Sequence, residues 1–141
     1  MTKDVKPTDV SKTLTMKEII ETQLAPAPIG PYSQAVRYNG MLYTSGQIAL
    51  DPQTGVLNNA SVAEETKQVM ENLKAVLEAA GLTFEQVIKT SIFITNMDDF
   101  GLINSIYSGY FNEASAPARE TVQVVRLPKD VRVEISMIAG A

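Results

Sequence analysis

Apolar residues recur at helical spacing in two segments of the chain, and short β-branched runs lie around these segments. In the first segment Ser61 and Glu64 form a capping box, and Gly81 is a typical helix stop. The apolar positions between them are Val62, Val69, Met70, Leu73, Val76, Leu77 and Ala80. This spacing predicts an amphipathic helix over 62–80 that packs on a sheet.

The second helical segment has its apolar stripe at Ile103, Ile106, Tyr107, Tyr110 and Phe111. Asp98 and Asp99 stand just before it, and an aspartate in that place can accept a hydrogen bond from a free backbone N–H of the first turn. The pattern predicts a helix capped by one of these two aspartates.

The strand-like runs are short and are separated by turn residues. Residues 34–38 and 41–47 flank Asn39-Gly40, a pair that supplies the positive φ of a two-residue hairpin turn. Residues 51–55 are predicted to form a turn. Further strands are predicted at 87–95, 117–124 and 131–139. Taken alone, the spacing makes the last two strands a hairpin across 127–130.

The predicted order is hairpin, helix, strand, helix, strand, strand, with no internal repeat. This order favours an α+β fold in which both helices cover one face of a mixed sheet. The other face then carries apolar side chains without a cover, and the simplest cover is another copy of the chain. We therefore expect an oligomer.

The N-terminal part of the chain differs in composition from the rest. Residues 1–16 are rich in Lys, Asp and Thr and have almost no apolar periodicity. We expect a flexible extension or a remnant of expression there, followed by a single domain over 17–141. Residues 25–31 contain three prolines, which fix φ and remove backbone donors. They are predicted to form an ordered arm that leads into Tyr32.

The composition excludes several classes of catalytic and metal-binding site. The 141 residues include no His and no Cys, which excludes Ser-His-Asp catalysis, cysteine nucleophiles and thiolate metal sites. The net charge of −4 and the scattered lysines argue against a nucleic-acid partner. No apolar run approaches the roughly 18 residues of a membrane helix, and no nucleotide-binding motif is present. We expect a soluble, cytoplasmic protein with no membrane partner, no metal and no cofactor.

Arg119 and Glu134 are the side chains best suited to chemistry in such a chain. Arg119 stands at the start of a predicted strand, where its planar guanidinium could hold a carboxylate by two parallel hydrogen bonds. A surface ion pair with Glu113 or Glu120 is the alternative. Glu134 lies in an otherwise apolar strand. It either faces solvent on an edge strand or is buried with a raised pKa, and then it can orient or deprotonate water.

Other positions have weaker cases, each with a structural alternative. Gly46, after Ser45, could let the backbone approach a ligand and offer its N–H, or it could form a bulge or turn. Tyr32 could contact a ligand or anchor the proline arm. Asn104 could face solvent on its helix. Lys89 is the one candidate for a Schiff-base lysine, and we expect it to point to solvent.

Five blocks occur in order over residues 19–139: APIGPYSQ at 27–34, SGQI at 45–48, NLKAVLEAAG at 72–81, VIKT at 87–90, and PAR at 117–119 followed by VEI at 133–135. In this order they resemble the Rid, or reactive intermediate deaminase, family, and specifically its RidA branch. The resemblance covers nearly the whole chain apart from the extension.

The resemblance implies a chorismate-mutase-like α+β fold, a homotrimer with a central barrel of sheets, and three clefts at the subunit interfaces. It implies that Arg119 holds the substrate carboxylate and that Glu134 positions the attacking water. The substrate-binding residues that it implies are Tyr32, Ser45, Gly46, Asn104 and Thr121. It also implies that the 87–95 strand pairs with the last strand.

The chain departs from the family pattern beside the arginine. Many members have Ser or Thr directly after it and often Cys one further, whereas this chain has Glu120 and Thr121. The missing thiol indicates that no cysteine chemistry is needed. Strand alternation predicts that Glu120 points away from Arg119. Ser136 stands at a position that is often acidic, so Glu134 is the only carboxylate of its strand.

The activity implied by the resemblance is cofactor-independent hydrolysis of 2-imino and 2-enamino acids, of the 2-aminoacrylate type released by pyridoxal-phosphate dehydratases, to 2-oxo acids and ammonia. The alternative is a 2-oxo-acid-binding or regulatory module on the same trimer. Glu134 argues against it, because a pure carboxylate binder gains nothing from a second negative charge. Ribonuclease activity or inhibition of translation, attached to some relatives, is disfavoured by the acidic composition and the absent His.

Overall fold

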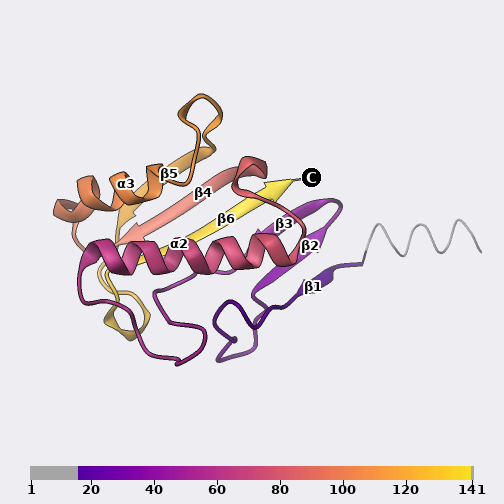
Figure 1. Cartoon of the computed structure of the whole chain (residues 1–141), viewed down its shortest axis with the longest axis horizontal. Coiled ribbons are helices and arrows are strands. Elements are labelled where there is room, and N and C mark those ends of the chain that lie inside the picture. The colour runs from indigo at the N-terminus through magenta and orange to yellow at the C-terminus, as the bar shows by residue number, and fades with distance from the viewer. Residues whose placement is uncertain (1–15, 141) are drawn as a thin grey trace, which may run out of the picture.

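The computed structural model describes residues 16–140, which form one mixed sheet with two helices packed against it (Figure 1). The strands are β1 (Glu18–Ile20), β2 (Ala35–Tyr38), β3 (Met41–Thr44), β4 (Val87–Ile94), β5 (Ala118–Gln123) and β6 (Val133–Gly140). The helices are α2 (Val62–Ala79) and α3 (Phe100–Ser108). Short 3₁₀ turns lie at Phe84–Gln86, Met97–Asp99, Glu113–Ser115 and Pro128–Asp130. The predicted extension over 1–16 lies, except for Met16, outside the described residues.

The order of the strands across the sheet is β1-β2-β3-β6-β4-β5. All neighbouring strands are antiparallel except β4 and β5, which are parallel. The pairing of β4 with the last strand, implied by the resemblance, is confirmed. The hairpin predicted for the last two strands is wrong. β6 buries every second residue and belongs inside the sheet, whereas β5 is largely exposed and forms its edge.

The first predicted helix and the hairpin are confirmed. The Ser61 hydroxyl accepts the backbone N–H of Glu64 at the start of α2, and the chain leaves the helix through Gly81 at φ +77°. The turn between β2 and β3 has positive φ at both Asn39 and Gly40, as a two-residue hairpin requires. The second hairpin strand ends at Thr44, three residues before the predicted end.

The predicted cap of the second helix is confirmed in position only, because Asp99 is the residue that directly precedes α3 but does not cap it with its side chain. A 3₁₀ turn over Met97–Asp99 precedes α3, and its cap is Asn96, whose side chain accepts the backbone N–H of Asp98. Asp99 already has helical φ and ψ and makes no capping hydrogen bond with its side chain. The side-chain capping hydrogen bond therefore comes from Asn96, at the start of the extra turn, rather than from Asp98 or Asp99. β1 was not predicted, because a strand of only three residues leaves no alternating pattern in the sequence.

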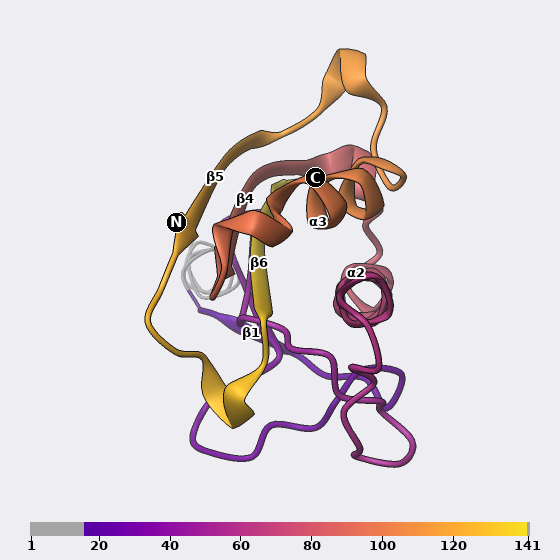
Figure 2. The same cartoon turned by 90° about the vertical axis from the view of Figure 1, so that its left-hand side faces the viewer.

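Both helices lie on one face of the sheet (Figure 2), as predicted. The core lies between this face and the apolar stripe of α2. Along β6 the residues Val133, Ile135, Met137 and Ala139 are buried, and the residues between them face the helix-free side. Large apolar side chains remain exposed on that side, such as Tyr43 on β3 and Val122 on β5. None of the helices among residues 16–140 is long and apolar enough to cross a membrane.

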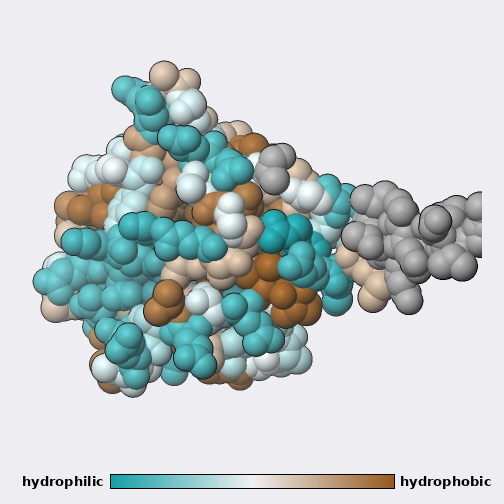
Figure 3. Space-filling model, turned by 45° about the vertical axis from the view of Figure 1, so that its right-hand side comes forward, coloured by the Kyte–Doolittle hydropathy of each residue, from teal (hydrophilic) through white to brown (hydrophobic). Residues whose placement is uncertain are grey.

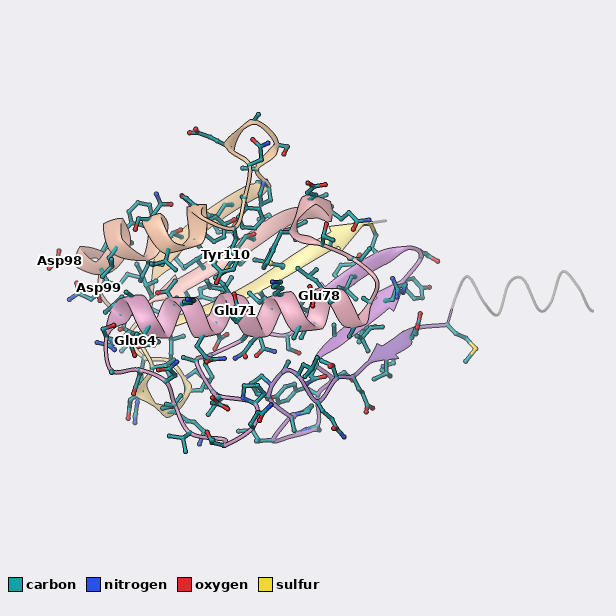
Figure 4. All side chains as sticks on the ribbon, viewed as in Figure 1. Glu64, Glu71, Glu78, Asp98, Asp99 and Tyr110 are labelled. Atoms are coloured by element: carbon teal, nitrogen blue, oxygen red, sulfur yellow. The ribbon has the colours of Figure 1, made fainter. Side chains whose placement is uncertain are left out.

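The solvent side of α2 is mostly hydrophilic (Figure 3). Glu64, Glu71 and Glu78 follow the helix at seven-residue intervals, and Tyr110 points toward Glu71 (Figure 4). The Tyr110 hydroxyl donates to the Glu71 carboxylate at 2.7 Å, which ties the segment after α3 to α2. Burial and the neighbouring Glu71 raise the pKa of Tyr110, so this phenol stays protonated and remains a donor.

A buried carboxylate holds the start of β6. Glu65 of α2 is fully buried and accepts hydrogen bonds from the Arg132 backbone N–H at 2.6 Å, the Arg132 Nε at 2.8 Å and the Val133 N–H at 3.1 Å. A buried carboxylate that accepts three hydrogen bonds has the partners it needs. Glu65 therefore joins the first turns of α2 to the strand that carries Glu134.

Candidate functional site

Arg119 lies on β5, and its side chain contacts α3. Its Nη1 donates to Asn104 Oδ1 at 2.5 Å, so the structure brings together two of the predicted site residues. The Arg119 Cζ lies 5.7 Å from the ring centroid of Phe100 and 5.1 Å from that of Tyr107. An adjoining cavity of about 590 Å³ is lined by Asn104, Tyr107, Ser108, Phe111, Glu113, Ala116, Pro117 and Arg119.

The surface ion pairs considered for Arg119 are not formed. Among residues 16–140 no carboxylate lies within 4.0 Å of its guanidinium. Glu120 points to the other face of the sheet, as strand alternation predicts, and there it contacts Lys89 at 3.0 Å and Ser91 at 2.5 Å. Hydrogen bonds from Ser91 and then Lys89 lower the pKa of Glu120. Lys89 is thus a partly exposed ion-pair partner rather than a lysine in an apolar pocket.

Glu134 lies on β6 and faces the helix-free side. It is half-buried, and burial raises the pKa of its carboxyl group because desolvation disfavours the charged form. No described residue donates a hydrogen bond to its side chain. It borders a cavity of about 370 Å³ lined by Pro26, Ala27, Ile29, Tyr32, Gln34, Ser45, Gly46, Gln47, Ile48, Leu50, Pro128, Lys129 and Glu134.

Gly46 is required for the position of the Glu134 carboxylate. A Cβ at residue 46 would lie 2.3 Å from Glu134 Oε2, which no side chain could occupy without moving the carboxylate. No described residue accepts a hydrogen bond from the Gly46 N–H. The Ser45 hydroxyl donates to the Ser33 carbonyl at 2.5 Å, so its proton is used within the chain and only its lone pairs remain for a ligand.

Tyr32 is half-exposed at the rim of the same cavity, at the end of the predicted proline arm. The arm is held by Gln34, a buried residue that sequence analysis did not single out. Its amide nitrogen donates to the carbonyls of Thr22, Ala25 and Pro26 at 2.8–3.2 Å. The proline arm was the feature of the sequence that could have pointed to Gln34. A segment without regular structure needs side-chain donors for its carbonyl groups, and Gln34 lies just after the arm.

Thr121 follows Arg119 by two residues and lies on the same face of β5. Its hydroxyl is buried, and it has no hydrogen-bond partner among the described residues. Leaving a buried hydroxyl unpaired is unfavourable by about 1–3 kcal/mol. Thr121 does not line the cavity beside Arg119, so only its place on the same face of β5 links it to that site.

The predicted site residues thus form two groups. The arginine half-site consists of Arg119, Asn104 and Thr121, and the glutamate half-site consists of Glu134, Gly46, Ser45 and Tyr32. β4 separates β5 from β6, which alone places their residues about 10 Å apart. In register Arg119 is opposite Thr90, and Thr90 is opposite Met137, three residues beyond Glu134. One chain therefore does not bring Arg119 and Glu134 into one cavity.

The two rings beside Arg119 were not among the predicted site residues. Tyr107 was predicted as part of an apolar stripe, and Phe100 was not singled out. Their spacing from Asn104 could have indicated that they lie beside it in the site, because positions four before and three after a residue share its helix face. Among residues 16–140 no group of three or more Asp, Glu, His or Cys side chains could hold a metal ion.

Sequence comparison relates the chain to known proteins over nearly the whole described domain. The family model described as Endoribonuclease L-PSP matches residues 22–141. A RutC family protein of Synechocystis is 55% identical over 127 residues, which are 89% of this chain and 97% of the relative. The 2-iminobutanoate/2-iminopropanoate deaminase of Mus musculus is 48% identical over 124 residues, which are 88% of this chain and 91% of the relative.

Solved structures have the same fold. Escherichia coli TdcF with bound serine matches with a TM-score of 0.83 at 48% identity, over 88% of this chain and 98% of that one. RidA from an Antarctic Psychrobacter matches with a TM-score of 0.84 at 40% identity, over 88% and 99%. Identity of this extent, together with the shared fold, means that the chain belongs to the Rid (YjgF/L-PSP) family.

Proposed function

We propose that this protein hydrolyses 2-imino and 2-enamino acids to 2-oxo acids and ammonia, at a site shared between two subunits of a homotrimer. The observation that carries the proposal is the division of the site residues. Within residues 16–140, Arg119 has no carboxylate partner and borders one cavity, and Glu134 has no hydrogen-bond donor and borders another. A neighbouring copy of the chain can supply a glutamate half-site to the Arg119 cavity and an arginine half-site to the Glu134 cavity.

The two half-sites supply complementary parts of the chemistry. The Arg119 guanidinium binds the substrate carboxylate with two hydrogen bonds and so fixes the imine carbon beside it. Glu134 accepts a proton from water as the water oxygen bonds to that carbon. Glu134 then passes this proton to the imine nitrogen, which gives a tetrahedral carbon that carries a hydroxyl and an amino group. The hydroxyl proton is transferred to the nitrogen as the C=O bond forms and the C–N bond breaks, so the products are a 2-oxo acid and ammonia and Glu134 is ionised again. An enamine substrate first tautomerises to the imine.

The state of Glu134 suits this role. A general base works best when its pKa lies near the working pH, and burial moves the pKa of Glu134 upward from its ordinary value. Gly46 lies beside the carboxylate, and its N–H, which has no acceptor among the described residues, can donate to a polar atom of the substrate. The mouse relative is named for the same reaction, and the TdcF structure holds serine, an amino acid with a carboxylate.

The uncovered face of the sheet supports the proposed trimer. Tyr43 and Val122 are 46% and 40% exposed on this face, and exposed apolar surface of this kind is typical of an interface with another protein. A second copy of the chain is the simplest partner, since a rotational interface closes into a ring. Light scattering at micromolar concentration should return three times the mass of the chain.

The assay for the reaction couples the protein to an amino-acid dehydratase that releases 2-aminoacrylate. We expect ammonia and pyruvate to form faster than in the uncatalysed reaction. A protein that binds a 2-oxo acid but leaves the rate of ammonia release unchanged would instead be the non-catalytic module considered above.

Subunit complementation tests the shared site. Arg119→Lys and Glu134→Gln chains are each expected to keep about a tenth or less of the parental kcat/KM, and they are mixed in equal amounts, unfolded and refolded together. If each site takes Arg119 from one subunit and Glu134 from its neighbour, about a quarter of the sites in random trimers carry both native residues. Activity near a quarter of the parental value supports the proposal.

The control is to refold each variant separately and then mix the two without further exchange, which should restore nothing. Mixed trimers that stay as inactive as the separate variants would contradict a site divided between subunits, because a site within one chain cannot be complemented.

A further inference from the structure

Three residues of α3 face the Arg119 guanidinium from one stripe of the helix. Phe100, Asn104 and Tyr107 lie at positions i, i+4 and i+7, which point in the same direction from an α-helix. Asn104 accepts a hydrogen bond from Nη1, and the two rings have their centroids within 6 Å of Cζ. Both distances are within the range at which a cation is attracted to an aromatic face.

Arg119 differs in this respect from the other arginines of the chain. Arg37, Arg126 and Arg132 each contact a carboxylate at 2.6–3.0 Å. Within the described residues Arg119 contacts an amide oxygen and two rings instead, none of which carries a charge. The aromatic contacts therefore restrain the guanidinium without neutralising it, and its charge remains available to an anion.

Tyr107 is itself firmly held. It is 4% exposed, and its hydroxyl donates to the buried Thr90 Oγ1 at 3.0 Å. Thr90 is the register partner of Arg119 on the neighbouring strand β4. The ring also packs against Phe111 with a centroid separation of 4.7 Å. Contacts among Thr90, Tyr107 and Arg119 thus join β4, α3 and β5 around the guanidinium.

The contacts leave one edge of the guanidinium free. Arginine has five N–H donors, and Asn104 takes one of them on Nη1. The edge formed by Nε and Nη2 has no acceptor among the described residues and has the geometry that binds a carboxylate with two bonds. A guanidinium held in advance in this orientation loses less conformational freedom when it binds.

We propose that Phe100 and Tyr107 are positioning residues whose rings hold the Arg119 guanidinium and aim its free edge at the ligand carboxylate. The consequence for catalysis rests on the proposed function, but the restraint on Arg119 does not. Because the carboxylate is bound in both the ground state and the transition state, weakening the restraint should raise KM and change kcat little.

The restraint is measured by NMR of protein labelled with ¹⁵N, as the rate of rotation about the Nε–Cζ bond of Arg119. The Arg119 signal is assigned by its loss in Arg119→Lys. We expect Phe100→Leu to speed the rotation about three- to tenfold, which is the range of one cation–π contact. Tyr107→Phe keeps the ring but frees it from Thr90, and should speed the rotation less. Phe100→Tyr keeps a ring and should restore the parental rate.

Phe84→Leu is the matched control. Phe84 packs in the same aromatic cluster, with its ring centroid 5.3 Å from those of Tyr110 and Phe111, and is not one of the two rings beside the Arg119 guanidinium. It should change the melting temperature but not the rotation. In the activity assay Phe100→Leu should raise KM about three- to tenfold and change kcat less than about twofold.

Rotation at the parental rate in Phe100→Leu would overturn the inference, as would a fall in kcat with unchanged KM that merely follows the melting temperature. The two proposals fail separately. If the parent protein hydrolyses no imine, the proposed function is wrong, and the rotation rate alone decides whether the rings hold Arg119.

Discussion

The two half-sites are built in different ways. Arg119 is held by side chains of a regular helix, which supply an amide oxygen and two rings. Glu134 is surrounded by loop segments, by the proline arm and by a glycine whose lack of a side chain leaves space for the carboxylate. The charge of Arg119 is restrained yet not neutralised, whereas the charge of Glu134 is disfavoured by burial.

This difference indicates a division of labour. A binding group needs a fixed orientation and a permanent charge, and a helix packed against an edge strand provides a rigid support for it. A proton acceptor needs a pKa that can be shifted, and partial burial without donors provides that shift. Each half also has its own anchor in the core, Thr90 with Tyr107 for one and Glu65 with Arg132 for the other.

The largest effect should come from removing the proton acceptor. Glu134→Gln keeps the shape of the side chain but cannot accept the proton, so kcat should fall about a hundredfold or more, as is typical for the loss of a general base. Glu120→Gln is the matched control on the same face of the sheet and should keep nearly full activity. The measurement is ammonia release from 2-aminoacrylate; equal losses in both variants would argue that neither carboxylate is the base.

The arginine half-site should respond less strongly. Arg119→Lys keeps the charge and loses the planar fork, and one lost charge-assisted hydrogen bond of about 1.5–3 kcal/mol lowers kcat/KM by roughly one to two orders of magnitude. Arg126→Lys alters an exposed arginine that pairs with Asp130, and should leave kcat/KM unchanged. Parental kcat/KM in a trimeric Arg119→Lys protein would exclude Arg119 from the site.

A smaller effect is expected when the space around Glu134 is filled. Gly46→Ala places a Cβ where the carboxylate now lies and forces it aside, and we expect kcat/KM to fall by about one order of magnitude, in line with the cost of a misplaced catalytic group. Gly101→Ala adds a Cβ in open space on α3 and should leave activity unchanged. If both variants retain full activity, the position of the carboxylate is not critical.

The smallest effect concerns pH. Since burial raises the pKa of Glu134, kcat/KM should decline on the acid side with a midpoint above 4.5, the ordinary value. The same shift means that this group stabilises the fold below its unfolded-state pKa, and that the stabilisation is lost as pH rises through the folded-state pKa. Glu134→Gln should remove that component of the pH dependence of unfolding; an unchanged profile would mean that Glu134 is effectively solvated.

Local patterns along the chain determined the elements that depend on neighbouring residues. The α2 stripe, its Ser61 cap and the Asn39-Gly40 turn were all predictable, because a helix and a two-residue hairpin are specified by positions within a few residues of each other. The alternation that turns Glu120 away from Arg119 is local in the same sense. The collinear blocks of the Rid family supplied the pairing of β4 with β6, which spacing alone assigned wrongly.

Only the tertiary structure decided where the site residues lie relative to each other. Arg119 and Glu134 are 15 positions apart in the sequence, yet they face opposite sides of the sheet with β4 between their strands. The space that Gly46 leaves for Glu134, the rings that hold Arg119 and the buried pair of Glu65 with Arg132 all join distant segments. Such contacts depend on packing and strand order, which the spacing of residues along a single chain does not encode.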